Sequence, residues 1–263
     1  MILHRLAISS GLLLPLGIVA SQTFEGAAGT EGTQTYKLSQ TKKASSAALS
    51  HRIDPVVEKM QGWKVHIDPS LLNGDHGSEG ARALSMLDNH LERISLLVTG
   101  ERLTQLRSLE IWIESEHPEL ENMQYHPAVE WLVARGYDAR LVKKVHIPRA
   151  ANLLSRQQLL KHPFVVLHEL AHAYHDQFLS FDDTRILAAF ERAERAGNYQ
   201  QVLDHRGSTV EHYALSDHKE YFAEATEAYF YRNDFYPFVA AELEQHDPGM
   251  YRLLGEIWGS LAP

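Results

Sequence analysis

Apolar and polar positions alternate in two short segments of this chain and follow a helical spacing in the segment between them. Gly62–Asp68 is apolar at every second position, and Leu109–Glu114 repeats this alternation, so both segments are predicted to be strands. Glu79–Leu97 instead carries apolar residues at intervals of three and four, which is typical of a helix with one buried face. The folded part of the chain is therefore predicted to open as strand, helix, strand.

The rest of the chain is predicted to be mainly helical. A short helix is expected at Pro127–Ala134 and a short strand at Lys144–Ile147, and helical patterns dominate from Ser155 onward. The predicted fold class is α+β, in which a small N-terminal sheet with its helices packs on a mainly helical C-terminal lobe. A cleft is expected between the two parts, with Leu109–Glu114 as the edge strand that could pair with an extended peptide.

One predicted helix, Phe164–Leu179, has an apolar side and a side that carries histidines. It contains no Gly or Pro and follows Pro163, a residue that favours the start of a helix. At 100° per residue, its apolar side chains form one stripe and its histidines project away from that stripe. The stripe consists of Leu167, Leu170, Ala171, Tyr174 and Phe178, and the histidines are His168, His172 and His175. This helix can bury one side and offer the other to a cleft.

The histidine side of this helix has the spacing of a metal site. His168 and His172 are four residues apart, so both imidazoles can reach a single Zn²⁺. Glu169 lies about 100° further round the helix. It is therefore expected to act as general base on a water at the open coordination position, as in the H-E-x-x-H pattern. The alternative is a helix whose histidines are solvated or hydrogen-bonded in the core.

A catalytic zinc site usually has three protein ligands, so a further residue is needed. The predicted helix Lys219–Arg232 places Glu220, Glu224 and Glu227 on one face. Glu220 is the candidate third ligand, Glu224 is expected to accept the second N–H of a ligand histidine, and Glu227 is expected to face solvent. Two alternatives stay open: Asp217 could form a capping arrangement with Glu220 in place of metal binding, and Glu224 could be solvated.

Two segments carry a family resemblance. His168–Asp176, with the pattern H-E-L-x-H-A-x-x-D, resembles the active-site helix of gluzincins such as thermolysin. Tyr213, seven residues before Glu220 in the run Glu-Tyr-Phe-Ala-Glu, makes the second segment look like the catalytic domain of the anthrax lethal factor and Pro-Pro endopeptidase family. The resemblance covers Pro163–Asp176 and Tyr213–Glu224, and the remaining chain only in outline.

This resemblance implies a zincin-like fold of the gluzincin type and assigns further roles. The residue matching Glu220 is the third zinc ligand in that family, and the residue matching Tyr213 helps to stabilise the tetrahedral intermediate. The residue matching Asp176 orients the site from behind the ligands. His175 departs from the family pattern because it adds a third imidazole, which we expect to line the cleft or to bind a carboxylate behind the metal ligands.

The first 51 residues differ in composition from the rest. His4 and Arg5 precede the apolar run Leu6–Ala20, which is too short to span a bilayer comfortably, so residues 1–20 are predicted to be a signal peptide. Residues 21–51 are predicted to be a flexible leader and residues 52–263 the zinc metallopeptidase domain. The expected location is extracellular or periplasmic, with no stable membrane association after cleavage. A retained anchor and a buried N-terminal helix are the alternatives.

The composition of the chain limits the possible metal ligands and binding partners. The chain has no cysteine, so a zinc ion would be held by histidines and carboxylates alone. Its net charge of −9 argues against nucleic acid as a partner. The expected function is that of a secreted zinc-dependent peptidase, most simply an endopeptidase, acting on a peptide or protein bound extended in a cleft. The alternatives are a non-catalytic zinc- or peptide-binding protein of the same fold and a zinc hydrolase of a non-peptide bond. The oligomeric state is left open.

Overall fold

The computed structural model describes residues 51–74 and 76–261, and these form an α+β fold built on one mixed five-stranded sheet. The strand order is β1-β2-β3-β5-β4, with β1 and β4 antiparallel to their neighbours and the three central strands parallel. The strands are β1 (Val56–Met60), β2 (Trp63–Ile67), β3 (Glu110–Ile113), β4 (Gln124–Tyr125) and β5 (Lys144–Ile147). The expected signal peptide and nearly all of the expected leader lie outside the described residues.

Three of these strands were predicted from the sequence, and β1 was not. β2, β3 and β5 lie within or match the predicted segments. β1 escapes a search for alternation because it has no buried residue: Val56 is 40% exposed and Val57 is 53% exposed. It joins β2 through a two-residue turn in which Gln61 and Gly62 both have positive φ, at 48° and 100°. Such a turn suits the twist of a hairpin and is favoured by glycine.

The prediction that Leu109–Glu114 forms the edge of the sheet is wrong. β3 lies in the centre of the sheet, between β2 and β5, and the edge next to the helical part is β4. Every position of Ile111–Ile113 is buried, as expected for a strand covered on both faces. β4 has only two paired residues and ends two residues before Pro127, so it carries too short an alternation to be recognised from sequence.

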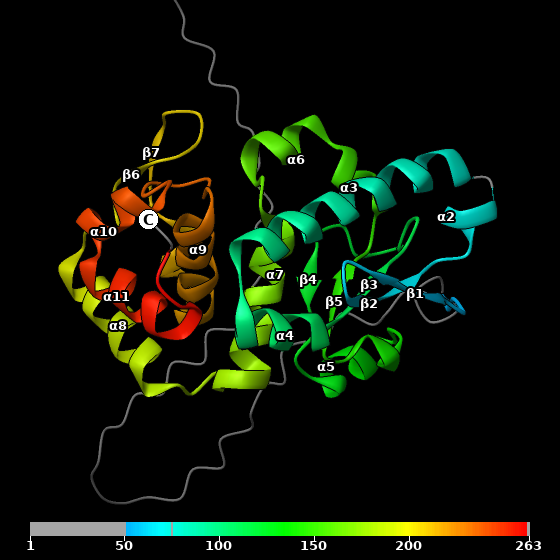
Figure 1. Ribbon diagram of the computed structural model, residues 1–263, viewed down its shortest axis with the longest axis horizontal. Helices are drawn as coiled ribbons and strands as arrows, with labels where there is room; N and C mark the ends of the chain where they lie inside the picture. The colour runs from blue at the N-terminus through cyan, green and yellow to red at the C-terminus, as the bar shows by residue number, and fades with distance from the viewer. Residues whose placement is uncertain (1–50, 75, 262–263) are drawn as a thin grey trace, which may run out of the picture. The chain divides into compact units, whose positions relative to one another are not determined.

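Helices cover both faces of the sheet. Ile111 and Ile113 contribute to the main core, together with α3, and Trp112 points to the opposite face and packs with Leu132 and Leu141 in a smaller core. Figure 1 shows α3 running along one face of the sheet and α5 lying on the other side. The helices of this part are α2 (Ser70–Asn73), α3 (Gly77–Leu97), α4 (Gly100–Ser108), α5 (Val129–Ala134) and the 3₁₀ turn η1 (Ala139–Leu141). The predicted helices Glu79–Leu97 and Pro127–Ala134 are thus confirmed.

The second part of the chain is mainly helical, as predicted. Its first elements are η2 (Ala150–Leu154), α6 (Arg156–Lys161), α7 (Val165–Tyr174), the π turn η3 (His175–Leu179) and α8 (Thr184–Ala196). They are followed by β6 (Val202–Leu203), β7 (Thr209–Val210), η4 (Tyr213–Leu215), α9 (His218–Phe230), α10 (Ala240–His246) and α11 (Pro248–Trp258). Figure 1 shows α7 between the sheet and α9, and it contacts both β4 and α9.

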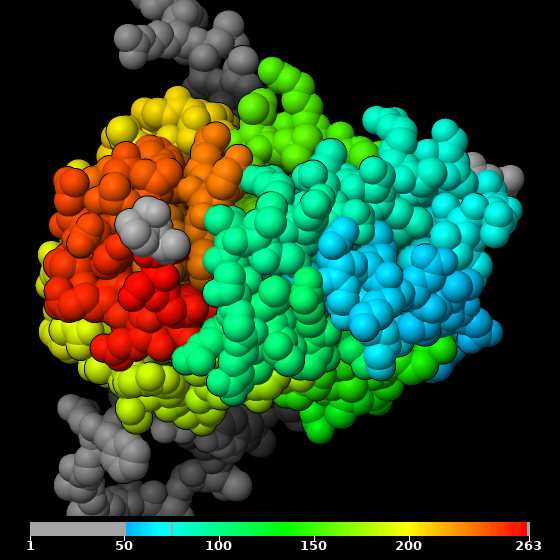
Figure 2. Space-filling view, viewed as in Figure 1, coloured from blue at the N-terminus to red at the C-terminus, as the bar shows by residue number. Residues whose placement is uncertain are grey.

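The two parts of this domain are in direct contact beside α7. Arg102 on α4 donates a hydrogen bond to the carbonyl of Ile257 on α11, at 2.9 Å. On the face shown in Figure 2, the surface of α4 adjoins that of α11, so α7 is covered on this side. Among the described residues, no helix has the length and apolar character needed to cross a membrane.

Candidate metal centre

The helix α7 is held in place by its apolar side. Leu167, Leu170 and Ala171 are fully buried, and Tyr174 packs against Trp258 with ring centroids 4.4 Å apart. Phe178 was expected on the same stripe but is 40% exposed. The helix changes at His175 into a single π turn, which changes the angular spacing of the residues that follow. The stripe therefore ends with Tyr174, and the histidine side of α7 faces α9.

Three predicted ligand atoms converge where α7 meets α9. His168 Nε2 and His172 Nε2 are 3.1 Å apart, and Glu220 Oε2 lies 3.2 Å from His168 Nε2 and 3.3 Å from His172 Nε2. Zinc–nitrogen and zinc–oxygen bonds of about 2.0–2.1 Å in tetrahedral geometry place neighbouring ligand atoms about 3.3 Å apart. The nearly equilateral triangle of donors therefore fits a tetrahedral Zn²⁺ with one position left open.

The helix that carries Glu220 is capped by a different residue, Asp217. Asp217 accepts hydrogen bonds from the backbone N–H groups of Lys219, at 2.8 Å, and Glu220, at 3.0 Å. The predicted cap and the predicted position of Glu220 beside the histidines thus occur together, and they are not alternatives. Burial alone would raise the pKa of Glu220, but His172 and His168 outweigh it and lower the pKa. The carboxylate is ionised, as a ligand of zinc must be.

Glu169 lies beside the triangle as an available base. Its side chain is 7% exposed and makes no hydrogen bond to any residue that the structure describes. Burial raises its pKa, while the nearby imidazoles of His168 and His172 oppose this shift. A carboxylate that is nearly buried but unpaired can accept a proton from a water held next to it.

Tyr213 lies at the rim of the same site. It begins the short turn η4, in which His212 Nδ1 accepts a hydrogen bond from the backbone N–H of Ala214 at 3.0 Å. The tyrosine is 48% exposed. Burial of the hydroxyl and the negative charge of Glu220 raise its pKa to about 12, with smaller contributions from other carboxylates of the site. The phenol therefore keeps its proton at neutral pH and can act as a hydrogen-bond donor.

The prediction that Glu227 faces solvent is wrong, because α9 is buried on all sides between Tyr221 and Phe230. Glu227 is fully buried, and its Oε1 lies 2.8 Å from His168 Nδ1. Glu224 was expected in this position, and it is also buried, but its Oε1 is 3.6 Å from the same nitrogen. The three glutamates do share one face of α9, as the spacing indicated, and the residue that accepts the second N–H of His168 is Glu227.

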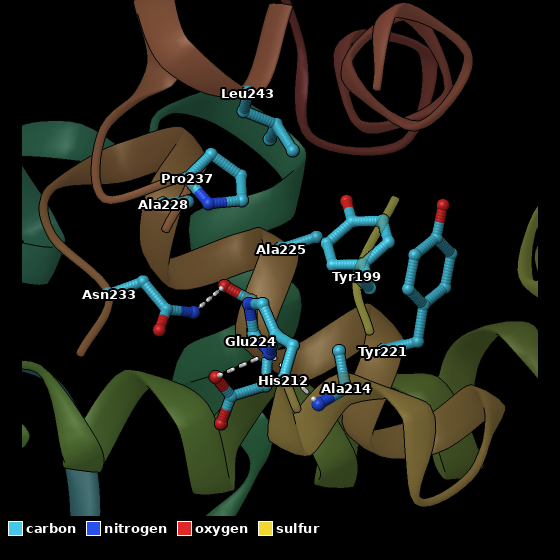
Figure 3. A pocket seen from close by; sticks show the side chains of 10 residues that line it. All are labelled: Tyr199, His212, Ala214, Tyr221, Glu224, Ala225, Ala228, Asn233, Pro237 and Leu243. Carbon is cyan, nitrogen blue, oxygen red and sulfur yellow. Dashed lines mark hydrogen bonds and ion pairs between the residues drawn. The ribbon is translucent and has the colours of Figure 1, made fainter. Parts of the chain in front are cut away.

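The two buried glutamates differ in charge. Burial alone would raise the pKa of Glu227, but His162 and His168 lower it to about 2. For Glu224, burial and the neighbouring Asp234 raise the pKa to about 8. Glu224 also borders a small cavity behind α9 (Figure 3), whose volume of about 10 Å³ has room for at most one water molecule and excludes a substrate.

His175 and Asp176 lie away from the ligand triangle. The ring of His175 is fully buried between Phe181 and Phe222, and neither ring nitrogen has a hydrogen-bond partner among the described residues. Burial lowers its pKa to about 3, so it is neutral. Asp176 instead accepts hydrogen bonds from Tyr125 and Lys143, both at 2.5 Å. It therefore ties the π turn after α7 to the edge strand β4.

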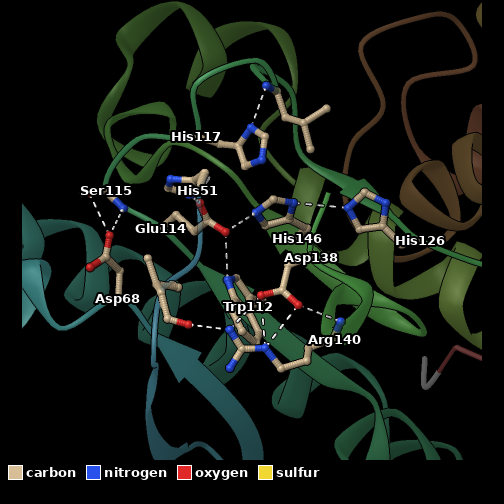
Figure 4. A network of polar contacts seen from close by, with 12 residues as sticks. His51, Asp68, Trp112, Glu114, Ser115, His117, His126, Asp138, Arg140 and His146 are labelled. Carbon is tan, nitrogen blue, oxygen red and sulfur yellow. Dashed lines mark hydrogen bonds and ion pairs between the residues drawn. The ribbon is translucent and has the colours of Figure 1, made fainter. Parts of the chain in front are cut away.

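A second group of histidines surrounds Glu114 on the sheet (Figure 4) and was not recognised in the sequence. Glu114 Oε2 lies 2.6 Å from His51 Nε2, and Glu114 Oε1 accepts a hydrogen bond from the indole of Trp112 at 2.9 Å. His146 Nε2 lies 3.2 Å from the same Oε1. The residues of this group are far apart in the chain, so no local sequence spacing predicts that they come together. His51, which the sequence placed in the leader, is part of the packed structure.

This second group does not have the geometry of a zinc site. His51 Nε2 and Glu114 Oε2 are 2.6 Å apart, which is a hydrogen-bond distance and too short for two ligands of one zinc ion. His117 completes the group, but its Nδ1 accepts the backbone N–H of Leu120 at 2.9 Å. The proton of the neutral ring is therefore on Nε2, which cannot bind a metal in that form. The group is a hydrogen-bonded core of the sheet.

No family model matches this sequence, and neither a curated protein nor a solved structure matches it.

Proposed function

We propose that this protein is a zinc-dependent peptidase of the gluzincin type, with His168, His172 and Glu220 as the zinc ligands. One observation carries the proposal: three atoms able to bind zinc lie 3.1–3.3 Å from one another, beside a carboxylate that has no hydrogen bond to the described residues. Two imidazoles and one glutamate are a ligand set of catalytic zinc sites in peptidases. The zincin-like fold is part of this proposal, supported by the position of α7 between a mixed sheet and a helical part.

When bound, Zn²⁺ supplies a Lewis acid that activates water near neutral pH and polarises a carbonyl group. Glu169 takes the proton of the attacking water and returns it to the leaving amine, a task suited to a buried carboxylate with a raised pKa. Tyr213 keeps its proton because its pKa is about 12, and it donates a hydrogen bond to the oxyanion that develops on the substrate. The roles of acid, base and donor are thus divided between two residues.

The substrate we propose is an extended peptide or protein segment that pairs with β4. β4 is the end strand of the sheet order, and it contacts α7. An extended segment can add to such an edge through backbone hydrogen bonds. Tyr125 on this strand is held by Asp176, which fixes the edge relative to the metal helix. Secretion, which the segment Leu6–Ala20 predicts, is part of the same proposal.

The test is cleavage of a peptide library by the purified protein, with and without a chelator. We expect cleavage that the chelator abolishes and that one equivalent of Zn²⁺ restores. Glu169→Gln should keep zinc and lose nearly all activity, whereas Glu194→Gln, on the exposed side of α8, should match the wild type. Zinc binding with no cleavage of peptides would favour a binding protein or a hydrolase of another bond, and undiminished turnover in Glu169→Gln would remove the proposed base.

A further inference from the structure

The orientation of His168 depends on what its second ring nitrogen contacts. A neutral histidine that offers Nε2 to a metal carries its proton on Nδ1, and a buried N–H needs an acceptor. Glu227 Oε1 lies 2.8 Å from His168 Nδ1, within hydrogen-bond distance. The nearest oxygen of Glu224 lies 3.6 Å from the same atom, which is too far for a hydrogen bond. The acceptor is therefore Glu227.

A second imidazole holds Glu227 from the other side. His162, just before α7, places its Nε2 2.6 Å from the same Oε1 of Glu227. Its ring also stands edge-on to the ring of His168, with centroids 5.0 Å apart and an angle of 84° between the planes. The other oxygen of Glu227 has no hydrogen-bond partner among the described residues. The position of this buried carboxylate is thus set by two histidines, one of which is a candidate zinc ligand.

Glu224 lies one turn before Glu227 on α9 and makes different contacts. Its backbone carbonyl accepts a hydrogen bond from Asn233 at 2.7 Å, and its side chain borders the small cavity of Figure 3. Its Oε2 is 3.9 Å from His212 Nδ1, again too far for a hydrogen bond. Glu224 therefore belongs to the packing behind α9 more than to the ligand triangle.

We propose that Glu227, held in place by His162, is the positioning residue that orients His168 toward the zinc ion. The inference rests on the zinc site proposed above and adds a chain of three residues, His162, Glu227 and His168, that runs behind it. A carboxylate in this position fixes the tautomer and the ring plane of a ligand histidine and increases its basicity, and loss of such a partner typically lowers metal affinity 10- to 100-fold.

The direct test compares two isosteric changes on the same helix. We would measure zinc affinity by competition with a chromophoric chelator for the wild type, Glu227→Gln and Glu224→Gln. Both glutamates are buried and lie one turn apart, so the same substitution is made at two neighbouring buried positions of one helix. We expect Glu227→Gln to bind zinc roughly 10- to 100-fold more weakly, and Glu224→Gln to differ far less. Thermal unfolding of the metal-free proteins checks that both variants fold.

His162→Gln provides a variant that does not depend on a fully buried position, because the side chain of His162 is 16% exposed. We expect it to weaken zinc binding roughly tenfold. If His162 acts through Glu227, the double variant should bind zinc no more weakly than Glu227→Gln alone. Visible absorption of the Co²⁺-substituted proteins adds a readout of ligand geometry, and we expect the bands of Glu227→Gln and His162→Gln to shift together.

The outcomes separate this inference from the proposed function. A wild-type protein that binds no zinc would refute the proposed function itself. Zinc bound by the wild type and equally tightly by Glu227→Gln would leave that function standing and overturn the role of Glu227. A larger loss in Glu224→Gln than in Glu227→Gln would overturn it as well. Additive losses in the double variant would show that His162 acts independently of Glu227 and would overturn the proposed chain.

Discussion

Replacement of Tyr213 by phenylalanine removes a single hydroxyl from the rim of the candidate site. The phenol is 48% exposed and makes no hydrogen bond to the described residues, so Tyr213→Phe should change the free energy of unfolding by less than about 0.5 kcal/mol. Zinc content should also stay the same, because the ligand triangle consists of other residues. The change therefore isolates the proposed contribution to the transition state.

The size of that contribution follows from the exposure of the residue. Loss of one donor to a developing oxyanion typically lowers kcat about 100- to 1,000-fold, or about 2.7–4 kcal/mol. Because Tyr213 is half exposed, water can partly replace its hydrogen bond, which favours the lower limit of this range. We expect kcat to fall about 100-fold with little change in KM. The pKa of about 12 predicts that the wild-type residue remains a donor across the neutral range.

The assay is steady-state hydrolysis of a peptide substrate by zinc-loaded protein. Tyr231→Phe is the matched control, because Tyr231 is 46% exposed and its ring contacts Arg93 through a face that phenylalanine also has, at 4.2 Å. We expect this control to retain the wild-type kcat. An unchanged kcat in Tyr213→Phe would refute the donor role, and a fall matched by loss of zinc would show that the residue supports the metal site instead.

Three further predictions concern stability. Asp217→Ala removes the N-cap of α9 and should cost about 1 kcal/mol in urea unfolding. Phe222→Ala empties a fully buried position and should cost about 3–5 kcal/mol in the same measurement; a cost below about 1 kcal/mol would argue against its place in the core. For Glu110, burial alone would raise the pKa, but Lys64 and His66 lower it to about 2 from 4.5. Its ionised form thus contributes stability above pH 4.5 that is lost as the pH falls toward 2, and Glu110→Gln should flatten the acid limb of a stability–pH curve.

The elements with long or regular patterns could be predicted from the sequence. The 21-residue helix α3 and the strands β2 and β5 have clear periodicity, and α7 follows a proline with no interruption. β1 and β4 could not be recognised, because β1 is exposed on both faces and β4 pairs through only two residues. The identity of the edge strand depends on how β4 folds back beside β5, which is a long-range arrangement.

In the candidate site, too, the features set by local spacing could be predicted and those set by long-range packing could not. The spacing of His168, Glu169 and His172 depends on one helix, so local geometry was enough to bring them together. The convergence of Glu220 could be anticipated from the acidic face of α9. The burial of Glu227 could not, because it depends on packing around the whole circumference of α9. The histidines around Glu114 come from separate loops and strands, so only the three-dimensional structure brings them together.

The most direct test of the central claim is the location of zinc in the folded protein. A crystal grown from zinc-loaded protein would be measured on both sides of the zinc absorption edge to give an anomalous difference map. We predict a single strong peak about 2.0–2.1 Å from His168 Nε2, His172 Nε2 and a carboxylate oxygen of Glu220. A peak at another group, such as the one around Glu114, or no peak between these three residues, would contradict the proposed zinc site.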